Sequence, residues 1–362
     1  MNKHEQTDRL VRYQRQTIFP GLGQVGQERL LAAQVVVVGC GATGTAICNH
    51  LVRAGVGHVR IVDRDFIELN NLQRQMLFDE DDIADNLPKA EAAAKKLRVI
   101  NSDIEVEAIV ADVSPGNVLG LIEGATVVMD GTDNFTTRYL LNDACLSLKK
   151  PWVYTGVVAS YGTTATFIPE GALDIVGAEI SSTGCLRCLY GDMPAPGTMA
   201  TCDTAGVIGP AVGVITSIAA GEAIKLITGK GTLNPGIIHM DVWTHDYEQF
   251  GRSGENGGKR PGCVACGQGD YQYLNAEIGT TSSILCGRNA VQVSTHNTQP
   301  LVLAQVAANL QPVADWQMHN DYLLRAHVNG YEFTIFPDNR AIIKGTEDEA
   351  KARSLYAQYI GS

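Results

Sequence analysis

The chain has 362 residues, 45% of them hydrophobic and 19% charged, which is the composition of a soluble globular protein large enough for more than one domain. Its 28 Lys and Arg residues against 39 Asp and Glu residues give a formal charge of −11, which argues against a surface for nucleic acid or for an anionic membrane. The polar N-terminus lacks the pattern of a signal peptide, so we expect a cytoplasmic protein. Its nine cysteines are then expected to be reduced, as metal ligands or catalytic thiols rather than in disulfides.

Alternating strand and helix patterns over residues 1–272 predict an α/β domain with a doubly wound, Rossmann-like and mostly parallel sheet. The expected strands are 35–38, 59–62, 104–108 and 126–129, and the expected helices are 24–33, 43–54, 88–100 and 118–123. Strands near 152–156, 163–167 and 236–241 are expected to extend the sheet, some of them antiparallel. The apolar stretch 207–227 is interrupted by a proline and two charged residues, so it predicts a buried helix and not a membrane span.

The pattern changes after residue 272, and residues 273–362 predict a small α+β domain. Its expected strands are 290–295, 322–328, 331–336 and 341–343, and its expected helices are 300–310 and 348–359. The dipeptide Asn329-Gly330 between two of these strands is a strong hairpin signal. The role of this domain does not follow from its residues.

Two C-x-x-C pairs predict a structural zinc site. Cys185-Leu-Arg-Cys188 and Cys263-Val-Ala-Cys266 supply four thiolates, which zinc binds as a tetrahedron. Such a site would tie the end of the first domain back to its middle. The alternatives are a dithiol redox pair, although redox motifs usually occur singly near the start of a βαβ unit, and unconnected core cysteines.

A glycine-rich loop predicts a nucleotide site. Gly39, Gly41 and Gly44 follow an expected strand and open an expected helix, the context in which backbone N–H groups approach a phosphate. Asp63 ends the next strand and is placed to accept hydrogen bonds from ribose hydroxyls. These features fit NAD as well as ATP, and a glycine turn without a ligand is the remaining alternative.

Cationic residues after Asp63 favour ATP over NAD. Asn71 and Arg74 lie in the run Asn70-Asn-Leu-Gln-Arg-Gln75, and Lys89 opens a later helix. Adenylation builds negative charge on the α-phosphate and on departing pyrophosphate, which Arg and Lys stabilise, whereas hydride transfer needs no such cations. The alternative is that Arg74 and Lys89 belong to a solvated surface.

A carboxylate at the end of another strand predicts a magnesium site. Asp133, in Asp130-Gly-Thr-Asp-Asn134, is placed where α/β proteins bind ligands. Magnesium usually takes one or two carboxylates together with phosphate oxygens. The competing interpretation of Asp133 is a simple helix N-cap.

These motifs together resemble the ThiF/MoeB/HesA-type adenylyltransferases, which are related to ubiquitin-activating enzymes. The resemblance runs from Arg12-Tyr-Gln-Arg15-Gln to Cys266 and includes the glycine loop, Asn71-Leu-Gln-Arg74-Gln, Pro88-Lys89, Thr132-Asp133-Asn134, Cys202-Asp-Thr-Ala-Gly206 and both cysteine pairs. It implies an enzyme that uses ATP to adenylate the C-terminal Gly-Gly carboxylate of a small ubiquitin-fold sulfur-carrier protein, in thiamin-thiazole or molybdopterin biosynthesis, with release of pyrophosphate. A cysteine desulfurase or another sulfur donor is an expected further partner.

The resemblance also implies roles for individual residues. Asp63 would hold ribose and Asp133 magnesium. The phosphates would be held by Asn71, Arg74 and Lys89. Arg15 resembles the arginine that reaches across a homodimer into the neighbouring ATP site. The C-terminal domain resembles an extension of some bacterial members, with Leu285-Cys-Gly-Arg288 and Gly345-Thr-Glu-Asp348 as its recognisable pieces.

Cys202 stands apart from the zinc pairs and is a candidate nucleophile. A thiol near a helix N-terminus has a lowered pKa and attacks more readily as thiolate. In the family, this position matches a cysteine that captures the acyl group from the carrier adenylate; the alternative is a packed core cysteine. For the whole chain, the competing hypotheses are an NAD-dependent oxidoreductase, a non-catalytic scaffold that binds carriers, and a tRNA-modifying relative.

Overall fold

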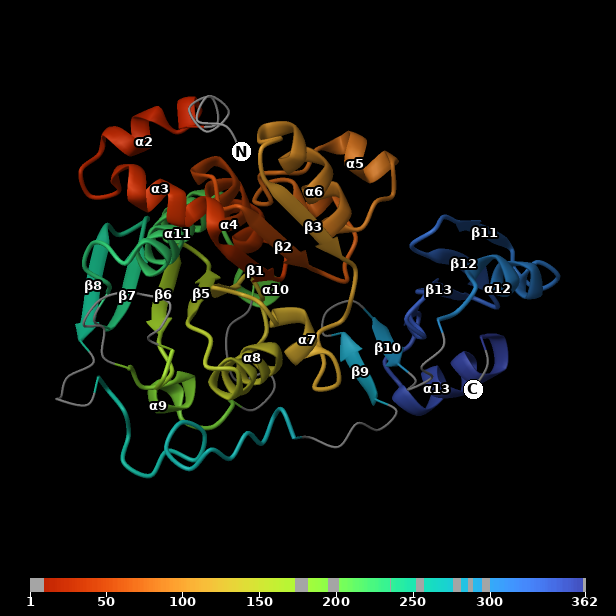
Figure 1. Ribbon diagram of the computed structural model, residues 1–362. Helices are drawn as coiled ribbons and strands as arrows, with labels where there is room; N and C mark the ends of the chain where they lie inside the picture. The colour runs from red at the N-terminus through yellow and green to blue at the C-terminus, as the bar shows by residue number, and fades with distance from the viewer. Residues whose placement is uncertain are drawn as a thin grey trace. The chain divides into compact units, whose positions relative to one another are not determined.

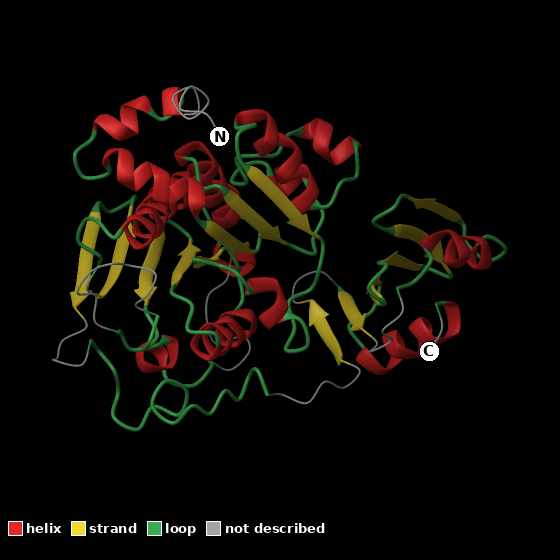
Figure 2. Ribbon diagram, in the orientation of Figure 1, coloured by secondary structure: helices red, strands yellow, loops and turns green. Residues whose placement is uncertain are grey.

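The computed structural model describes residues 10–172, 182–194, 202–234, 236–251, 257–275, 281–285, 289–294 and 300–360. The chain divides into two compact units, Met1–Ala276 and Glu277–Ser362. Helices and strands alternate along most of the first unit, whereas strands predominate in the second (Figures 1 and 2).

Eight strands in the described part of the first unit form one sheet, in the order β3-β2-β1-β4-β5-β6-β7-β8. They are β1 (Gln34–Val38), β2 (His58–Val62), β3 (Glu105–Ile109), β4 (Val127–Asp130), β5 (Trp152–Val158), β6 (Tyr161–Phe167), β7 (Gly236–Asp241) and β8 (Asp246–Gly251). The pairs from β3 to β5 are parallel, and those from β5 to β8 are antiparallel. The predicted doubly wound, mostly parallel sheet is therefore confirmed, and its order reverses at β1.

Helices cover both faces of this sheet. The helical segments are α2 (Gln14–Ile18), α3 (Gly23–Ala32), α4 (Ala42–Ala54), the 3-10 helix η1 (Leu69–Asn71), α5 (Glu80–Ala84), α6 (Lys89–Ile100), α7 (Val118–Ile122), α8 (Phe135–Ser147), α9 (Leu186–Tyr190), α10 (Cys202–Ala205) and α11 (Gly209–Thr228). Alternate side chains of β1 point to opposite faces: Val35 and Val37 pack with α4, α6 and α11, while Val36 and Val38 pack with α7 and α8. A strand buried on both sides needs this continuous apolar run.

Helix α11 is long and apolar enough to cross a membrane by length and composition alone. Most of it is buried, in contacts with α3, α4, β5 and β6. Its Glu222 is 2% exposed and accepts hydrogen bonds from Thr166 Oγ1 on β6 and from the backbone N–H of Asn234. We therefore describe α11 as a core helix, as its sequence predicts.

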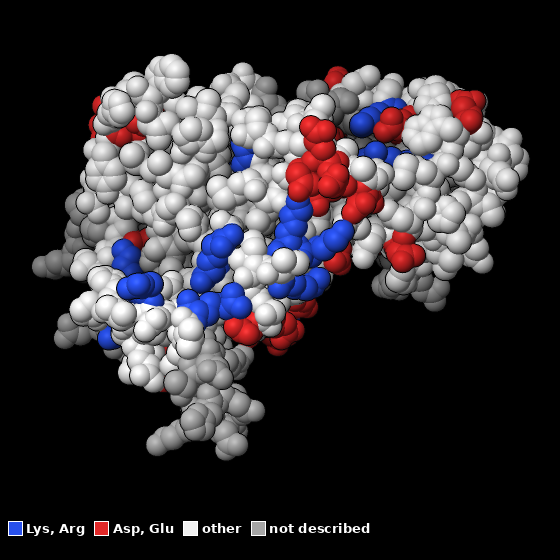
Figure 3. Space-filling view, turned by 90° about the horizontal axis from the view of Figure 1, so that it is seen from above, with Lys and Arg blue, Asp and Glu red and all other residues white. Residues whose placement is uncertain are grey.

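Charged side chains on α5 and α6 form ion pairs. Lys96 contacts Asp79 and Asp82, and Lys95 lies 3.1 Å from Asp85. Acidic and basic side chains consequently lie beside one another on the face shown in Figure 3. The exposed pair of Lys95 and Asp85 contributes little to stability, about 0–1 kcal/mol, whereas Asp82 is buried.

The described part of the second unit contains one antiparallel sheet in the order β11-β12-β13-β14-β10-β9, with two helices packed against it. Its elements are β9 (Thr281–Leu285), β10 (Ala290–Ser294), α12 (Leu303–Leu310), β11 (Trp316–His319), β12 (Leu324–Val328), β13 (Tyr331–Ile335), β14 (Arg340–Lys344) and α13 (Glu349–Tyr359). The predicted hairpin is confirmed, because Val328 pairs with Tyr331 and the two turn residues have φ values of 51° and 82°. Cys286 to Arg288, part of the motif noted in the sequence, lie outside the described residues.

Candidate functional site

The segments that follow β1, β2 and β4 lie beside one another at the carboxyl ends of these strands. The backbone N–H of Gly39 donates to Val62 O over 2.7 Å, and that of Gly131 donates to Val38 O over the same distance. The loops that follow the three strands therefore lie side by side. In doubly wound sheets, ligands bind at the carboxyl ends of the strands where the strand order reverses, which is here between β1 and β4.

The three predicted loop glycines have different packing requirements. A Cβ on Gly44 would stand 1.9 Å from Gly39 O, and one on Gly39, whose φ is +89°, would stand 2.6 Å from Gly131 O. Gly41, the N-cap of α4, has open space instead, since its nearest neighbour would be the side-chain nitrogen of Gln75 at 3.8 Å. Close packing therefore explains why Gly39 and Gly44 are glycines. No neighbouring atom of the described chain fills the space at Gly41, so a ligand could approach the backbone there.

Gln75 borders that space. It is 4% exposed, and its Oε1 has no hydrogen-bond partner among the described residues. A buried amide oxygen without a partner costs about 1–3 kcal/mol, so its presence beside an open cradle needs an explanation. The side-chain nitrogen of Gln75, which faces the space at Gly41, can donate a hydrogen bond to a group bound there. Gln75 belongs to the run singled out in the sequence, but no sequence signal separated it from its neighbours.

Asp63 closes the loop from the β2 side. Its Oδ2 accepts from Cys40 N at 2.5 Å, and its Oδ1 accepts from Asp65 N at 2.6 Å. Burial raises the pKa of Asp63, and the nearby Lys89 ammonium opposes that rise. A carboxylate fixed by two backbone donors retains lone pairs for further donors, such as ribose hydroxyls.

The two predicted cations differ in their surroundings. Lys89 opens α6, is 7% exposed and has its Nζ 3.5 Å from Asp65 Oδ2, so its interpretation as part of a solvated surface is wrong. Arg74 is half-buried and donates from Nη1 to Asn70 O over 2.7 Å. Asn71, in η1, is buried and is held by the Glu68 backbone N–H and by the side chain of Asn70.

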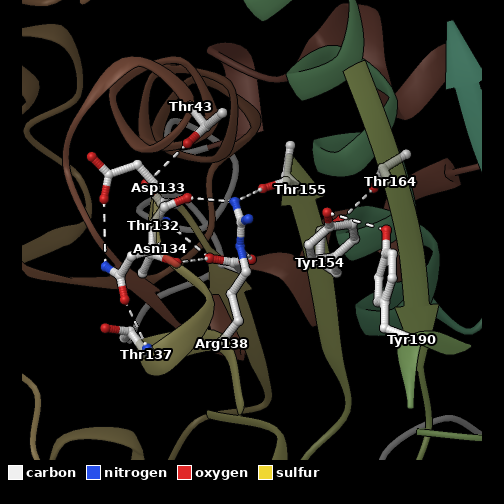
Figure 4. A network of polar contacts seen from close by, with 12 residues as sticks. Thr43, Thr132, Asp133, Asn134, Thr137, Arg138, Tyr154, Thr155, Thr164 and Tyr190 are labelled. Atoms are coloured by element: carbon white, nitrogen blue, oxygen red, sulfur yellow. Dashed lines mark hydrogen bonds and ion pairs between the residues drawn. The ribbon is translucent and has the colours of Figure 1, made fainter. Parts of the chain in front are cut away.

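The turn that carries Asp133 is held by a buried ion pair (Figure 4). Arg138 on α8 donates from Nε to Asp130 Oδ2 over 3.0 Å and from Nη2 to Thr132 O over 2.7 Å. Asp130, which is fully buried, also accepts from the backbone and hydroxyl of Thr132. On the other side, Thr43 Oγ1 of α4 donates to Gly131 O over 3.0 Å. The support given by Arg138 was not predicted.

Asp133 itself is exposed at this turn, and its Oδ1 accepts a hydrogen bond of 3.4 Å from Asn134 Nδ2. The N-cap of α8 is Asn134, whose side chain accepts from Thr137 N, so the interpretation of Asp133 as that cap is wrong. Arg15, on α2, is exposed and makes no hydrogen bond or ion pair with other residues that the structure describes. It does not join the strand-end cluster of its own chain.

The four cysteines of the two C-x-x-C pairs come together. The sulfur of Cys185 is 4.0 Å from that of Cys188 and 3.7 Å from that of Cys263, while Cys188 and Cys266 are 3.4 Å apart. Four sulfurs bound to one zinc at about 2.3 Å would lie about 3.8 Å from one another. Hydrogen bonds within the cluster lower the pKa of Cys188 and raise the pKa of Cys185, and all four sulfurs would bind zinc as thiolates. The set fits tetrahedral zinc.

Cys202 is the first residue of the short helix α10. It is half-buried, and its Sγ donates to Val157 O of β5 over 3.4 Å. Beside it, the backbone N–H groups of Ala159 and Ile208 tie the segment after α10 to the end of β5. The Cys202 thiol therefore does not belong to the four-cysteine cluster, and it is only partly buried.

Comparisons with known proteins agree with this geometry. The sequence matches the ThiF family over residues 13–263. A sulfur carrier protein ThiS adenylyltransferase of Bacillus subtilis is 40% identical over 350 residues, 97% of this chain and 99% of that protein. A sulfur carrier protein adenylyltransferase of Thermus thermophilus is 40% identical over 260 residues, 72% of this chain and 92% of that protein. The crystal structure of E. coli MccB with ATP has a TM-score of 0.55 at 24% identity, over 67% of this chain and 69% of that one, a likeness in fold.

Proposed function

The chain belongs to the ThiF family, and we propose that it adenylates the C-terminal Gly-Gly carboxylate of a ubiquitin-fold sulfur-carrier protein with ATP. The observation that carries this proposal is the identity of 40% with a ThiS adenylyltransferase over nearly the full length of both chains. An NAD-dependent oxidoreductase and a carrier-binding scaffold without chemistry receive no support from these relatives.

The extent of the match favours the thiazole pathway. The ThiF family match ends at residue 263, before the second unit begins. The alignment with the Thermus thermophilus protein covers 72% of the chain, less than the length of the first unit, whereas that with the Bacillus subtilis protein covers 97% and therefore includes most of the second unit. Because the likeness to the ThiS adenylyltransferase includes the second unit, we propose a ThiS-type carrier as substrate.

The strand-end cluster would supply several of the groups that adenylation requires. A carboxylate oxygen of the carrier bonds to the α-phosphorus of ATP as the bond to the bridging oxygen breaks and pyrophosphate leaves. Asp63 orients the ribose, and the loop from Gly39 to Gly44 admits the phosphates. Asn71, Arg74 and Lys89 hold the phosphate oxygens and stabilise the charge that develops on them. Asp133 would hold Mg²⁺, which neutralises phosphate charge when bound.

Arg15 supports a homodimeric enzyme. It is exposed on α2 and separate from the strand ends of its own chain, and the α2–α3 region also exposes apolar Ile18, Phe19 and Val25. A partner copy covering this region would bury the apolar side chains. Arg15 would then contact the phosphates of the neighbouring ATP.

Cys202 provides a second chemical step. Its sulfur attacks the acyl carbon of the carrier adenylate, a C–S bond forms, AMP leaves and the thiol proton passes to solvent. The terminal sulfur of a persulfide donor, such as a cysteine desulfurase, would then attack the acyl carbon, so that the Cys202 thiol leaves and an acyl disulfide forms. A further thiol would reduce that disulfide, giving the carrier thiocarboxylate and a new disulfide on the donor side. The reduced thiols that both Cys202 and the zinc cluster need are consistent with a cytoplasmic enzyme.

Isotope exchange between pyrophosphate and ATP tests the first step. Exchange is expected only with ATP, Mg²⁺ and a carrier that ends in Gly-Gly, and it should be faster with ThiS than with a molybdopterin-pathway carrier. The matched control is the same ThiS lacking its last two glycines, which should support no exchange. Exchange that is independent of the carrier would refute the proposal.

A further inference from the structure

The cysteine cluster is joined to α8 by hydrogen bonds. Cys185 is the N-cap of α9, and the next residue, Leu186, donates its N–H to Asn142 Oδ1 on α8 over 2.9 Å. Tyr139, also on α8, donates its hydroxyl to Gly191 O over 3.1 Å, just after α9 ends. The segment that carries the first C-x-x-C pair is therefore fixed at both ends to the helix that begins beside Asp133.

The last residue of α9, Tyr190, extends this connection to Arg138. Its ring lies 6.0 Å from the ring of Phe135 and 6.0 Å from that of Tyr154, both at steep angles, and its hydroxyl donates to Tyr154 Oη over 3.4 Å. The Arg138 guanidinium lies over the Tyr154 ring at 5.0 Å and over the Phe135 ring at 5.4 Å. Figure 4 shows Tyr190, Tyr154 and Arg138 in a row, with the guanidinium facing the Asp133 turn.

Arg138 sets the shape of that turn. It is 6% exposed and bonds Asp130, Thr132 O and, over 3.1 Å, Thr155 O. A buried guanidinium that loses part of its surroundings is costly, so its position depends on the aromatic rings that enclose it. A shift of Arg138 would release Thr132 O, which belongs to the residue directly before Asp133.

We infer that Tyr190 and Arg138 are positioning residues that couple the four-cysteine cluster energetically to the nucleotide site. Zinc fixes α9, α9 fixes Tyr190, and the Tyr190–Tyr154–Arg138 contacts hold the turn that presents Asp133. This inference rests on the proposed function only in requiring that Mg²⁺ and ATP bind beside that turn. Coupling between two binding sites is reciprocal, so Mg·ATP must tighten zinc binding by the factor by which zinc tightens Mg·ATP binding.

Zinc affinity measured at equilibrium tests the coupling without any turnover. Zinc is buffered with a chelator that does not bind magnesium, and occupancy is measured with Mg²⁺ alone and with saturating Mg·ATP. The proteins are the wild type, Tyr190→Leu, which removes the link, and Tyr247→Leu, a matched change at an exposed tyrosine on β8. Mg·ATP is expected to tighten zinc binding about fivefold or more in the wild type and in Tyr247→Leu, and less than twofold in Tyr190→Leu.

Calorimetric titration with Mg·ATP separates the possible failures. If the wild type binds no Mg·ATP, the proposed function fails and the coupling falls with it. If it binds Mg·ATP but zinc affinity does not change, the coupling alone is refuted. An equal effect in Tyr190→Leu also refutes it, because coupling through global stabilisation would persist in every variant that binds nucleotide. If the coupling exists, removal of zinc from the wild type should weaken Mg·ATP binding by the same factor by which Mg·ATP tightens zinc binding.

Discussion

Two glycine-to-alanine substitutions in one loop should have opposite effects. In Gly44→Ala, the added methyl would stand 1.9 Å from Gly39 O and 2.8 Å from Gly39 C, so the backbone of the loop or of α4 must move. Overpacking costs about 1–3 kcal/mol, and a clash between backbone atoms belongs at the upper end. At about 3 kcal/mol, the midpoint of thermal unfolding should fall by roughly 6–12 °C.

In Gly41→Ala, the methyl meets no atom closer than 3.8 Å, and the φ of −83° lies outside the left-handed region that favours glycine. Stability should change by less than about 1 kcal/mol, the scale of an N-cap change from Gly to Ala. The methyl instead fills the space assigned to the nucleotide. A cost of about 1–3 kcal/mol there corresponds to a roughly 5- to 150-fold loss of ATP affinity.

Calorimetric unfolding and Mg·ATP titration on the same two variants and the wild type provide the assay. Gly44→Ala should lose stability, and Gly41→Ala should lose ATP affinity at wild-type stability. If Gly41→Ala bound ATP as the wild type does, the space beside Gly41 would not hold the nucleotide. If Gly41→Ala unfolded as readily as Gly44→Ala, the packing argument for the loop would be wrong.

Three further substitutions test the other assigned groups. Asp133→Asn should lower magnesium-dependent pyrophosphate exchange about 10²- to 10³-fold, and near wild-type exchange would remove Asp133 from the metal site. Metal analysis should find one zinc per chain in the wild type and less in Cys185→Ser or Cys263→Ser, with lower unfolding temperatures; reduced wild-type protein without zinc would contradict the site. Cys202→Ala should keep pyrophosphate exchange yet form no covalent adduct with the carrier by mass spectrometry, and an adduct that persists would assign the capture to another thiol.

Much of the architecture could be predicted because its signals are local. The apolar run of β1, the glycine loop after it and the turn at Asn329 each depend on neighbours in the sequence. Strand β8 was not predicted, since its residues carry charge and exposed aromatic side chains at the edge of the sheet without regular alternation. Strands β9 and β11 also lie at the edges of their sheet, where burial imposes the least pattern.

The contacts that position the site residues could not be predicted, because they join segments that are distant in the sequence. No signal in the sequence indicated a contact between Asp130 and Arg138, and only the fold shows the ion pair that holds the Asp133 turn. Gln75 lies within a recognised motif, but its unsatisfied amide is visible only when the burial of its side chain is known. The side chains to which we assign the chemistry belong to local motifs, whereas the contacts that position them depend on packing between distant segments.

The charges around the strand ends indicate that a bound triphosphate needs more positive charge than one chain supplies. The cluster contains three carboxylates, Asp63, Asp65 and Asp133, and three cations, Arg64, Arg74 and Lys89. Lys89 and Arg64 are already compensated, Lys89 by Asp65 at 3.5 Å and Arg64 by Asp65 at 3.7 Å and Asp112 at 2.9 Å. Burial raises the pKa of Asp63, because it disfavours the charged form of that carboxyl group. A triphosphate that enters this cluster adds negative charge beside existing carboxylates, so its binding needs further positive charge. Magnesium on Asp133 and the Arg15 guanidinium of a second copy are the two sources in the proposed arrangement. Adenylation is then expected to require both the metal and the dimer, because each offsets repulsion that Arg74 and Lys89 cannot offset alone.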